Sequence, residues 1–375
     1  MVSKEEIISV LKQVLDPDLG LDIVRMGMVR DVDVKDGEIF CDIVLTTPAC
    51  PAKTKIEQDV KNVLDKNFGK EYKINVSMKS EVKRAPDNPS YKTPATRIIN
   101  LDNIKDVKNI VAVYSCKGGV GKSTVSTNLS LALAKQGARV GLLDLDLHGP
   151  NIPIMLGLVG QPKIRNSKIV PPEIYGMKVM SVGLLTDNSS PIIWRGPIQT
   201  TAVKQLFEDV GWGELDYLVL DLPPGTGDIH ITLSQNVPIS GMVMVSTPQL
   251  VSIIDTVKGV NMFEKMGVPI IGMVLNMAYY VCSKCGEKNY VFPRVNIENY
   301  LDGKKVDIIG EIPIDPKVAE CSDKGIPIVI EDTDGEVSKI FMDISSKVAS
   351  FLSTIAVKNS ISWVFWKVLL GGIFY

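Results

Sequence analysis

The chain has 375 residues, of which 45% are hydrophobic and 22% are charged. This usage is ordinary for a protein of two domains with a full hydrophobic core. The formal net charge is -2, which lacks the basic excess of nucleic-acid-binding proteins, so no nucleic-acid partner is expected.

The six cysteines are too sparse and irregular for a disulfide scaffold, so a reducing compartment is expected. The N-terminal stretch MVSKEEIISVLKQVL has neither the uninterrupted apolar core of a signal peptide nor the Arg- and Ser-rich composition of a transit peptide. We therefore predict a cytoplasmic protein.

Residues 1–80 are predicted to form a small α+β domain. Apolar residues recur at helical spacing near the N-terminus and again within 53–64. Between them, the runs 28–34 and 38–45 flank an Asp-Gly pair, which is typical of a β-hairpin. Alternating residues at 72–78 indicate a further strand.

Residues 81–96 contain three prolines and few apolar side chains, which is typical of a semi-stiff linker. From 97 to 357, short Val/Ile/Leu runs alternate with helical segments. Such runs suit parallel strands buried on both faces. The alternation predicts a doubly wound α/β domain with a mostly parallel sheet. Its strands are expected at 110–114, 139–145, 217–221, 242–246 and 270–275.

Residues 358–375 form an apolar C-terminal tail that includes ISWVFWKVLLGGIFY. This stretch is shorter than the roughly 20 residues that cross a bilayer. Two interpretations stay open: a packed terminus, which we favour, and a membrane-surface anchor. A membrane partner is therefore not expected.

The strongest local signal is VAVYSCKGGVGKST at residues 111–124. A strand leads into a glycine-rich loop, and a helix follows. The glycines permit positive φ angles and close approach to phosphate groups, and the helix N-terminus faces the anion. Lys122 would reach the β- and γ-phosphates of a nucleotide, and the Ser123 hydroxyl would ligate Mg²⁺.

The ordinary pattern G-x-x-x-x-G-K-[ST] fails at its first position, where Cys116 stands. K-G-G-V-G-K-S-T, with its second lysine at Lys117, instead resembles the deviant Walker A loop of the MinD/Mrp/nitrogenase-iron-protein class. The resemblance implies that Lys117 crosses a dimer interface to the partner's nucleotide. It also implies that Asn276, at the end of the strand IIGMVLN, reads the adenine edge. The expected ATP-binding residues are Gly118, Gly119, Val120, Gly121, Lys122, Ser123, Thr124 and Asn276.

Carboxylates follow two of the predicted strands, in LLDLDLHGPN and YLVLDLPPGTGD. The carboxyl ends of parallel strands border the crevice where ligands bind. We expect Asp221 to hold Mg²⁺ through water and Asp144 to support the metal or its loop. Asp146 is expected to orient the attacking water. The predicted catalytic residues are Lys117, Lys122 and Asp146.

Cys282 and Cys285 stand in NMAYYVCSKCGE, separated by two residues and followed by glycine. Such a knuckle aims two thiolates at one metal, whereas a complete cluster site usually needs four ligands. One chain therefore offers half a site, and a two-fold symmetric dimer would complete it. A redox dithiol and a zinc ribbon lacking its second half are the alternatives.

The position of this pair, after the strand that ends at Asn276, resembles that in the Mrp/ApbC family of iron–sulfur carriers. DLPPGTGDIHITLSQ and GEIPIDPKVAECSDKGIP are also similar to that family. The resemblance implies an ATP- and Mg²⁺-dependent homodimer that bridges a 4Fe-4S cluster and passes it to apo iron–sulfur proteins. YVFPRVNIENYLDG departs from the glycine-rich segment often seen after the cysteines.

The first domain, with DPDLGLDIVRMGMVRDVDV and LTTPACPAK, resembles the MIP18-like domain of iron–sulfur maturation proteins. Cys50 precedes a predicted helix, where a thiol can ligate or exchange metal; a buried turn cysteine is an equal alternative. Two other functions stay open for the whole chain: a MinD-type membrane switch, suggested by the apolar tail, and an electron carrier like the nitrogenase iron protein.

Overall fold

The computed structural model divides into two compact units, one of residues 1–86 with 346–375 and one of residues 87–345. The residues that it describes are 2–17, 19–87, 98–185, 196–293, 297–301, 303 and 306–370. The proline-containing stretch predicted to be a linker lies largely outside these residues.

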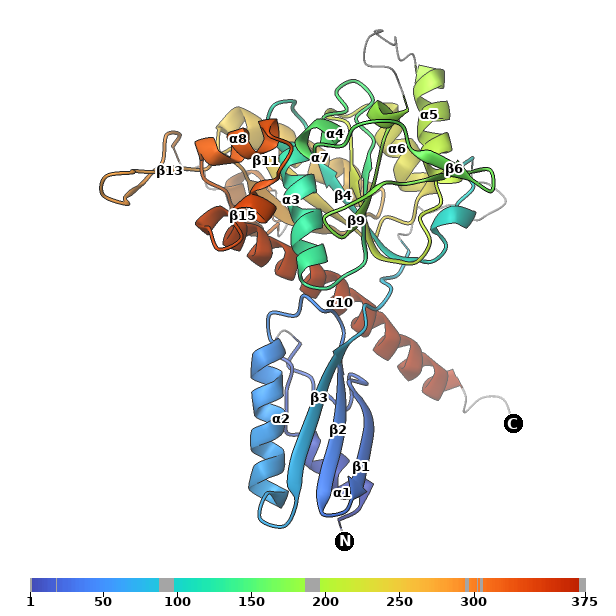
Figure 1. Cartoon of the computed structure of the whole chain (residues 1–375), viewed down its shortest axis with the longest axis vertical. Helices are drawn as coiled ribbons and strands as arrows, with labels where there is room; N and C mark the ends of the chain where they lie inside the picture. The colour runs from blue at the N-terminus through green and yellow to red at the C-terminus, as the bar shows by residue number, and fades with distance from the viewer. Residues whose placement is uncertain are drawn as a thin grey trace. The chain divides into compact units, whose positions relative to one another are not determined.

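The first unit contains a three-stranded sheet in the order β1-β2-β3 (Figure 1). The predicted hairpin is confirmed: β1 and β2 are antiparallel, and Asp36 and Gly37 connect them with φ angles of 50° and 78°. β2 and β3 are parallel, because α2 crosses over between them. The elements are α1 (Lys4–Leu11), β1 (Val29–Lys35), β2 (Glu38–Leu45), α2 (Lys53–Phe68) and β3 (Lys73–Ser80).

The C-terminal helix α10 (Glu336–Leu370) contributes to both units, which differs from the expected boundary between 357 and 358. Its residues from 346 onward belong to the first unit, where Val357 is buried in the core of α1, α2 and the sheet. The hydroxyl of Ser353 bonds to Thr46. The apolar residues near 357 therefore continue a helix that packs on the first domain.

The segment Glu336–Lys358 is long and apolar enough to cross a membrane by length and composition, but 50% of its most apolar 18-residue stretch is buried inside the protein. A core helix passes the same criterion. From residue 359 onward, the side chains of the predicted apolar tail lie outside the described residues.

The second unit is built on an eight-stranded sheet in the order β15-β12-β11-β4-β10-β5-β9-β8. All neighbouring strands are parallel except the edge pair β8 and β9. The five predicted strands are confirmed, as is the doubly wound class. The strands are β4 (Val107–Tyr114), β5 (Val140–Asp144), β8 (Glu173–Ile174), β9 (Met177–Ser181), β10 (Leu215–Asp221), β11 (Gly241–Ser246), β12 (Ile270–Leu275) and β15 (Ile308–Glu311).

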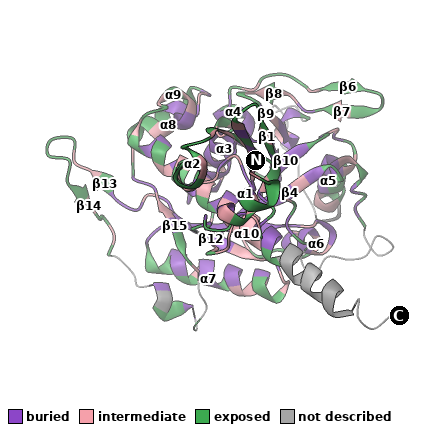
Figure 2. Cartoon of the chain, turned by 90° about the horizontal axis from the view of Figure 1, so that it is seen from below, coloured by how far each residue is buried: buried purple, intermediate pink, exposed green. Residues whose placement is uncertain are grey.

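Helices cover both faces of this sheet, which is why its central strands are buried throughout (Figure 2). In β4, Ile110, Ala112 and Tyr114 join the core beneath α5, α6 and α7, and the alternate residues face α3. The helices are α3 (Lys122–Lys135), α4 (Ile152–Met155), α5 (Gly196–Glu208), α6 (Asp228–Asn236), α7 (Leu250–Lys265), α8 (Pro316–Asp323) and α9 (Ile328–Glu331).

Two small antiparallel ribbons leave this body: β6 (Lys163–Arg165) with β7 (Lys168–Val170), and β13 (Tyr280–Val281) with β14 (Lys288–Asn289). Figure 1 shows the second ribbon projecting from one side of the unit. Three short 3₁₀ helices complete the described structure: η2 (Asp102–Ile104), η3 (Val182–Leu184) and η4 (Ile297–Tyr300).

Candidate nucleotide and metal sites

The glycine-rich loop joins β4 to α3 and adopts a conformation that glycine makes possible. Gly119 and Gly121 have φ angles of 77° and 87°, and Gly121 is the residue immediately before α3. A Cβ atom added at Gly118 or Gly119 would meet no atom within 4 Å. The loop is therefore an open cradle of backbone N–H groups at a helix N-terminus, as anion binding requires.

Lys122 is buried at this helix start and pairs with two carboxylates. Its Nζ lies 2.7 Å from Oδ2 of Asp221 and 3.5 Å from Oδ2 of Asp146. Because its side chain is only 6% exposed, the ammonium needs these partners to compensate for lost hydration. The two carboxylates therefore neutralise the ammonium here, as phosphate oxygens would with a nucleotide bound.

Asp221 is fully buried, and both of its oxygens accept hydrogen bonds. Ser123 donates to Oδ2 at 2.6 Å, and Ser126 donates to Oδ1 at 2.6 Å. The Ser123 hydroxyl and the Asp221 carboxylate thus lie side by side. Both are hard oxygen donors, which Mg²⁺ prefers, so these residues fit the metal expected here.

Asp144 ends β5 and has no exposed surface. Ser181 donates to its Oδ2 at 2.9 Å, and the backbone N–H of Asp146 donates to its Oδ1 at 3.1 Å. Burial, followed by repulsion from Asp221, raises the pKa of Asp144 well above its ordinary value. Lys122 acts in the opposite direction but does not outweigh these causes, so this carboxyl favours the neutral form.

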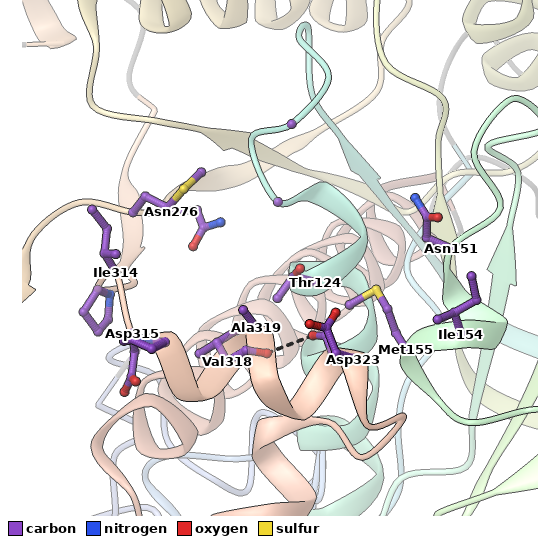
Figure 3. Close-up of a pocket in the computed structure, with 16 residues that line it drawn as sticks. Thr124, Asn151, Ile154, Met155, Asn276, Ile314, Asp315, Val318, Ala319 and Asp323 are labelled. Atoms are coloured by element: carbon purple, nitrogen blue, oxygen red, sulfur yellow. Dashed lines mark hydrogen bonds between the residues drawn. The ribbon is translucent and has the colours of Figure 1, made fainter.

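A cavity of about 570 Å³ opens beside the loop. Figure 3 shows Thr124 at the start of α3 across from Val318 and Ala319 of α8, with Asn276 above them. Met277 and Ile314 also line the cavity. The volume falls within the range of small-ligand sites, and the wall is largely apolar, as a stacked base requires.

Asn276 faces the glycine-rich loop. Its Nδ2 donates to the carbonyl of Val120 at 2.9 Å, and a Cβ atom on Gly121 would lie 2.0 Å from the same nitrogen. Asn276 is 8% exposed and lines the cavity. Its amide therefore supports the loop as well as facing the space where a base would lie.

The side chain of Lys117, the second lysine of the loop, contacts α7 of its own chain. Its Nζ is 3.2 Å from Oδ2 of Asp255 and donates to the carbonyl of Val251 at 3.2 Å. The preceding residue, Cys116, contacts the same helix through a hydrogen bond from its Sγ to the carbonyl of Asp255, 2.8 Å away. Lys117 is thus directed away from the phosphate cradle of its own chain.

Cys282 and Cys285 lie in the turn that closes the β13–β14 ribbon. The N–H of Cys282 donates to the carbonyl of Glu287, and the N–H of Gly286 donates to the carbonyl of Cys282. Gly286 has a φ of 75°, which lets the turn close as a knuckle. Hydrogen bonds from the backbone of Lys284 and Cys285, and then from the Cys285 thiol, lower the pKa of Cys282.

The ribbon is fixed to the body by Tyr279. Lys288 donates to the Tyr279 hydroxyl at 3.2 Å and lies 4.6 Å from the centre of its ring. Cys285 is exposed and Cys282 is half-buried, so both thiols can meet a ligand from outside. The segment 290–303, which departs from the family pattern, is described only in part.

Cys50 of the first domain borders a small cavity with Asp16, Thr47 and Ser353. It is half-buried and precedes α2. Neither of the two interpretations of this thiol is decided by that position. Cys41 is buried in β2, as expected of a core residue.

The sequence analysis missed three residues of the candidate site: Ser126, which bonds Asp221; Ser181, which bonds Asp144; and Asp255, which pairs with Lys117. The helix period places Ser126 one turn after Lys122, which is the single signal that would have found it. Ser181 and Asp255 come close to the loop only through the fold.

An open cradle at the start of a helix, a buried lysine and a strand-end aspartate define the second unit as a P-loop NTPase domain. The family model described as NUBPL iron-transfer P-loop NTPase matches residues 106–349. A second model, iron-sulfur cluster assembly protein, matches residues 4–76. The chain belongs to the Mrp/ApbC/NUBPL family of iron–sulfur cluster carriers, with an N-terminal domain of the iron–sulfur assembly type.

Relatives and a solved structure agree with this assignment. An iron-sulfur cluster carrier protein of Synechocystis is 39% identical over 363 residues, covering 95% of this chain and 100% of the relative. A mitochondrial iron-sulfur protein required for NADH dehydrogenase in Arabidopsis thaliana is 44% identical over 66% of this chain and 79% of the relative. An Archaeoglobus fulgidus nucleotide-binding protein in complex with ADP is 36% identical, with a TM-score of 0.55, over 64% of this chain and 94% of that one.

The Arabidopsis relative is named as mitochondrial. Family membership therefore does not define a compartment, and the cytoplasmic location stays a prediction.

Proposed function

We propose that two copies of this protein hold one 4Fe-4S cluster between them, each through Cys282 and Cys285, and deliver it to apo iron–sulfur proteins under the control of ATP. The observation that carries the proposal is the knuckle, which presents two thiols at the end of a ribbon. Within the described ranges, no group of three or more His, Cys, Asp or Glu side chains is placed to hold a metal.

A bridging cluster follows from ligand number. A cluster of this kind is held by four thiolates, and the knuckle supplies two. A two-fold axis near the ribbon would bring two knuckles together as an isologous interface. The lowered pKa of Cys282 favours the thiolate form that binds iron.

Anaerobic reconstitution of the full chain tests this site. The expected result is a dimer with about two irons per chain, which corresponds to one four-iron cluster per pair. The variant with Cys282→Ala and Cys285→Ala should lose this iron, whereas Cys321→Ala, on α8, should retain it. A fully loaded monomer, or full iron in the double variant, would reject the shared site.

The nucleotide part of the proposal begins with Lys122, which exchanges its carboxylate partners for phosphate oxygens when ATP binds. Ser123 and Asp221 would hold Mg²⁺, which supplies positive charge to the phosphates. Asp146, 3.5 Å from Lys122 and partly exposed, is placed to orient the attacking water. Asn276 and the apolar cavity would take the base.

Lys117 is proposed to contact the nucleotide of the partner subunit, as in the class its loop resembles. To make this contact, Lys117 must leave Asp255. Because the contact needs both a second subunit and its nucleotide, dimerisation and nucleotide binding would depend on each other. A nucleotide shifts an equilibrium only through its different affinity for the two states. The ATP-bound dimer is therefore proposed to hold the cluster with an affinity that hydrolysis changes.

ATP hydrolysis and cluster transfer are measured separately to test this coupling. The wild type should hydrolyse ATP slowly, and Lys122→Ala should abolish hydrolysis. Transfer from the loaded dimer to an apo acceptor should change with ATP in the wild type but not in Lys122→Ala. A cluster that cycles electrons yet never leaves the protein would instead support the electron-carrier alternative.

A further inference from the structure

His230 is a buried titratable residue that the proposed reaction does not use. It lies in the first turn of α6 and is 1% exposed. Its Nε2 is 2.9 Å from the carbonyl oxygen of Pro223, and its Nδ1 is 3.0 Å from that of Gly227. The imidazole therefore lies between carbonyl oxygens from the two ends of the loop 223–227.

This loop begins two residues after Asp221 and contacts the phosphate cradle. The N–H of Gly225, whose φ is 94°, donates to the carbonyl of Ser115 at 3.1 Å. Ser115 is the first residue after β4 and leads into the glycine-rich loop. A change in the conformation of the loop 223–227 therefore acts on the cradle directly, through the hydrogen bond between Gly225 and Ser115.

The two carbonyls make unequal demands on the ring. The carbonyl of Gly227 already accepts the backbone N–H of His230 at 3.1 Å. The carbonyl of Pro223 faces Nε2 of the ring and accepts a hydrogen bond when that nitrogen carries the hydrogen. A neutral imidazole has one N–H to give. The arrangement favours the tautomer that carries this hydrogen on Nε2 and donates it to Pro223.

The surroundings favour a neutral ring. Burial is the largest cause and lowers the pKa of His230. The hydrogen bonds to the carbonyls of Pro223 and Gly227 act in the opposite direction, and the positive charge of Lys122 on α3 lowers the pKa again. Tyr114 of β4 packs edge-on against the imidazole at 5.1 Å, and burial keeps its own hydroxyl protonated by raising its pKa. Phe263 of α7 packs on the other two rings.

We propose that His230 is a positioning residue: through Nε2–H it fixes the start of the loop 223–227 to the start of α6, and so holds Gly225 against the phosphate cradle. The proposal rests on the proposed ATPase function for its kinetic consequence but not for its structural one. The ring also packs on Tyr114, the last residue of β4. It thereby joins the strand that carries Asp221 to the strand that enters the cradle.

Three substitutions separate this role from simple core packing. His230→Gln places an amide N–H near the position of Nε2, His230→Asn places one near Nδ1, and His230→Phe keeps the ring packing but has no donor. If the role is only to fill space, Phe is the best replacement. If Nε2–H holds the loop, Gln is the best.

Amide hydrogen exchange at Gly225 in the full chain without nucleotide is the structural measurement. Exchange in His230→Phe and His230→Asn should be about fivefold faster than in the wild type, since one net hydrogen bond is worth ~1 kcal/mol. Exchange in His230→Gln should stay within about twofold of the wild type. Equal rates in all four proteins, or protection retained by Phe and not by Gln, would overturn the proposal.

The kinetic measurement is ATP hydrolysis by the same four proteins. His230→Phe and His230→Asn should lower kcat by about fivefold, with the KM for ATP within about twofold, because His230 does not line the nucleotide cavity. His230→Gln should recover kcat. Absence of hydrolysis in the wild type would reject the proposed ATPase, whereas the exchange result would still decide the role of His230.

The ring itself gives a measurement that needs no variant. The ¹⁵N chemical shifts of His230 in the wild type distinguish a protonated Nε2 from a protonated Nδ1. A shift pattern with hydrogen on Nε2 at neutral pH supports the proposal. Hydrogen on Nδ1 alone would overturn it, whether or not any substituted chain folds.

Discussion

Lys117 pairs with Asp255 of its own chain, with 3.2 Å between Nζ and Oδ2. Asp255 also pairs with Lys258 at 2.8 Å, and the hydrogen bonds from Lys258 and then Lys117 lower its pKa. The lysine proposed to reach a second subunit is thus retained by an ion pair on its own α7. If Lys117 crosses the interface as proposed, this pair must break and therefore opposes dimerisation.

We predict that Asp255→Asn promotes ATP-dependent dimerisation. The neutral amide releases Lys117 and keeps the size of the side chain, so less ATP should be needed for the same dimer fraction in sedimentation velocity. Lys258→Ala is the control, because it removes the other partner of Asp255 and leaves Lys117 in place. Weaker dimerisation of Asp255→Asn would mean that Asp255 acts across the interface instead.

Two glycines of the same loop, Gly118 and Gly121, should respond differently to substitution by alanine. Gly121 has a φ of 87°, and its Cβ would lie 2.0 Å from Asn276, so Gly121→Ala should lower the unfolding free energy by about 1–3 kcal/mol. At Gly118 a Cβ meets no atom and the φ angle is not positive. Gly118→Ala should keep stability within about 0.5 kcal/mol but occupy the cradle.

The matched measurement is urea unfolding together with ATP or ADP binding to both variants. Nucleotide affinity of Gly118→Ala should fall on the order of tenfold, the equivalent of about 1.4 kcal/mol. If Gly118→Ala binds as the wild type does, phosphate lies elsewhere in the loop.

The fold was predictable where burial leaves a compositional trace. Runs such as Ile110–Tyr114 are apolar on both faces, and this reveals a central parallel strand. The edge strands β8 and β15, and β9 beside β8, are short and mixed in composition, so periodicity does not separate them from loops. The passage of α10 into the first unit depends on long-range packing at Val357.

The candidate site divides in the same way. Gly118 to Thr124 form a local motif with fixed spacing, so a single stretch of sequence reveals the cradle. Ser181 is useful to Asp144 only because β9 is the neighbour of β5, and His230 only because α6 turns its ring back toward Pro223. Such residues are ordinary in sequence, and tertiary structure alone gives them their partners.

The buried carboxyl of Asp144 should make the nucleotide-free protein less stable as the pH rises. Its pKa is raised in the folded state by burial and then by Asp221, so the folded protein retains a proton that the unfolded chain loses above about pH 4. Unfolding then releases a proton, and stability falls with increasing pH. The stabilising contribution of the bound proton is complete below the unfolded pKa and is lost as the pH passes the raised folded value.

Asp144→Asn removes this titration while keeping a partner for Ser181. Urea unfolding between pH 5 and 8 should show a flatter dependence for the variant. The variant should also exceed the wild type in stability by about 1 kcal/mol or more at the upper end, since one pKa unit corresponds to about 1.4 kcal/mol. A wild type whose stability rises across this interval in parallel with the variant would show that Asp144 is ionised.

Cys282 should be alkylated before Cys285 and at a lower pH than an ordinary thiol. Hydrogen bonds from the backbone of Lys284 and Cys285, followed by the Cys285 thiol, lower its pKa, and alkylation follows the thiolate fraction. In the metal-free protein, the pH at which alkylation by iodoacetamide reaches half its maximal rate should lie below the ordinary thiol pKa of about 8.5.

Cys285→Ala should move this pH part of the way back, because one of the three hydrogen-bond donors to Cys282 is lost. Lys284→Gln should leave it unchanged, because the backbone of Lys284, and not its ammonium group, makes the bond. A profile that follows the Lys284 charge would show that the knuckle is open in solution, with its thiolate stabilised by the side chain.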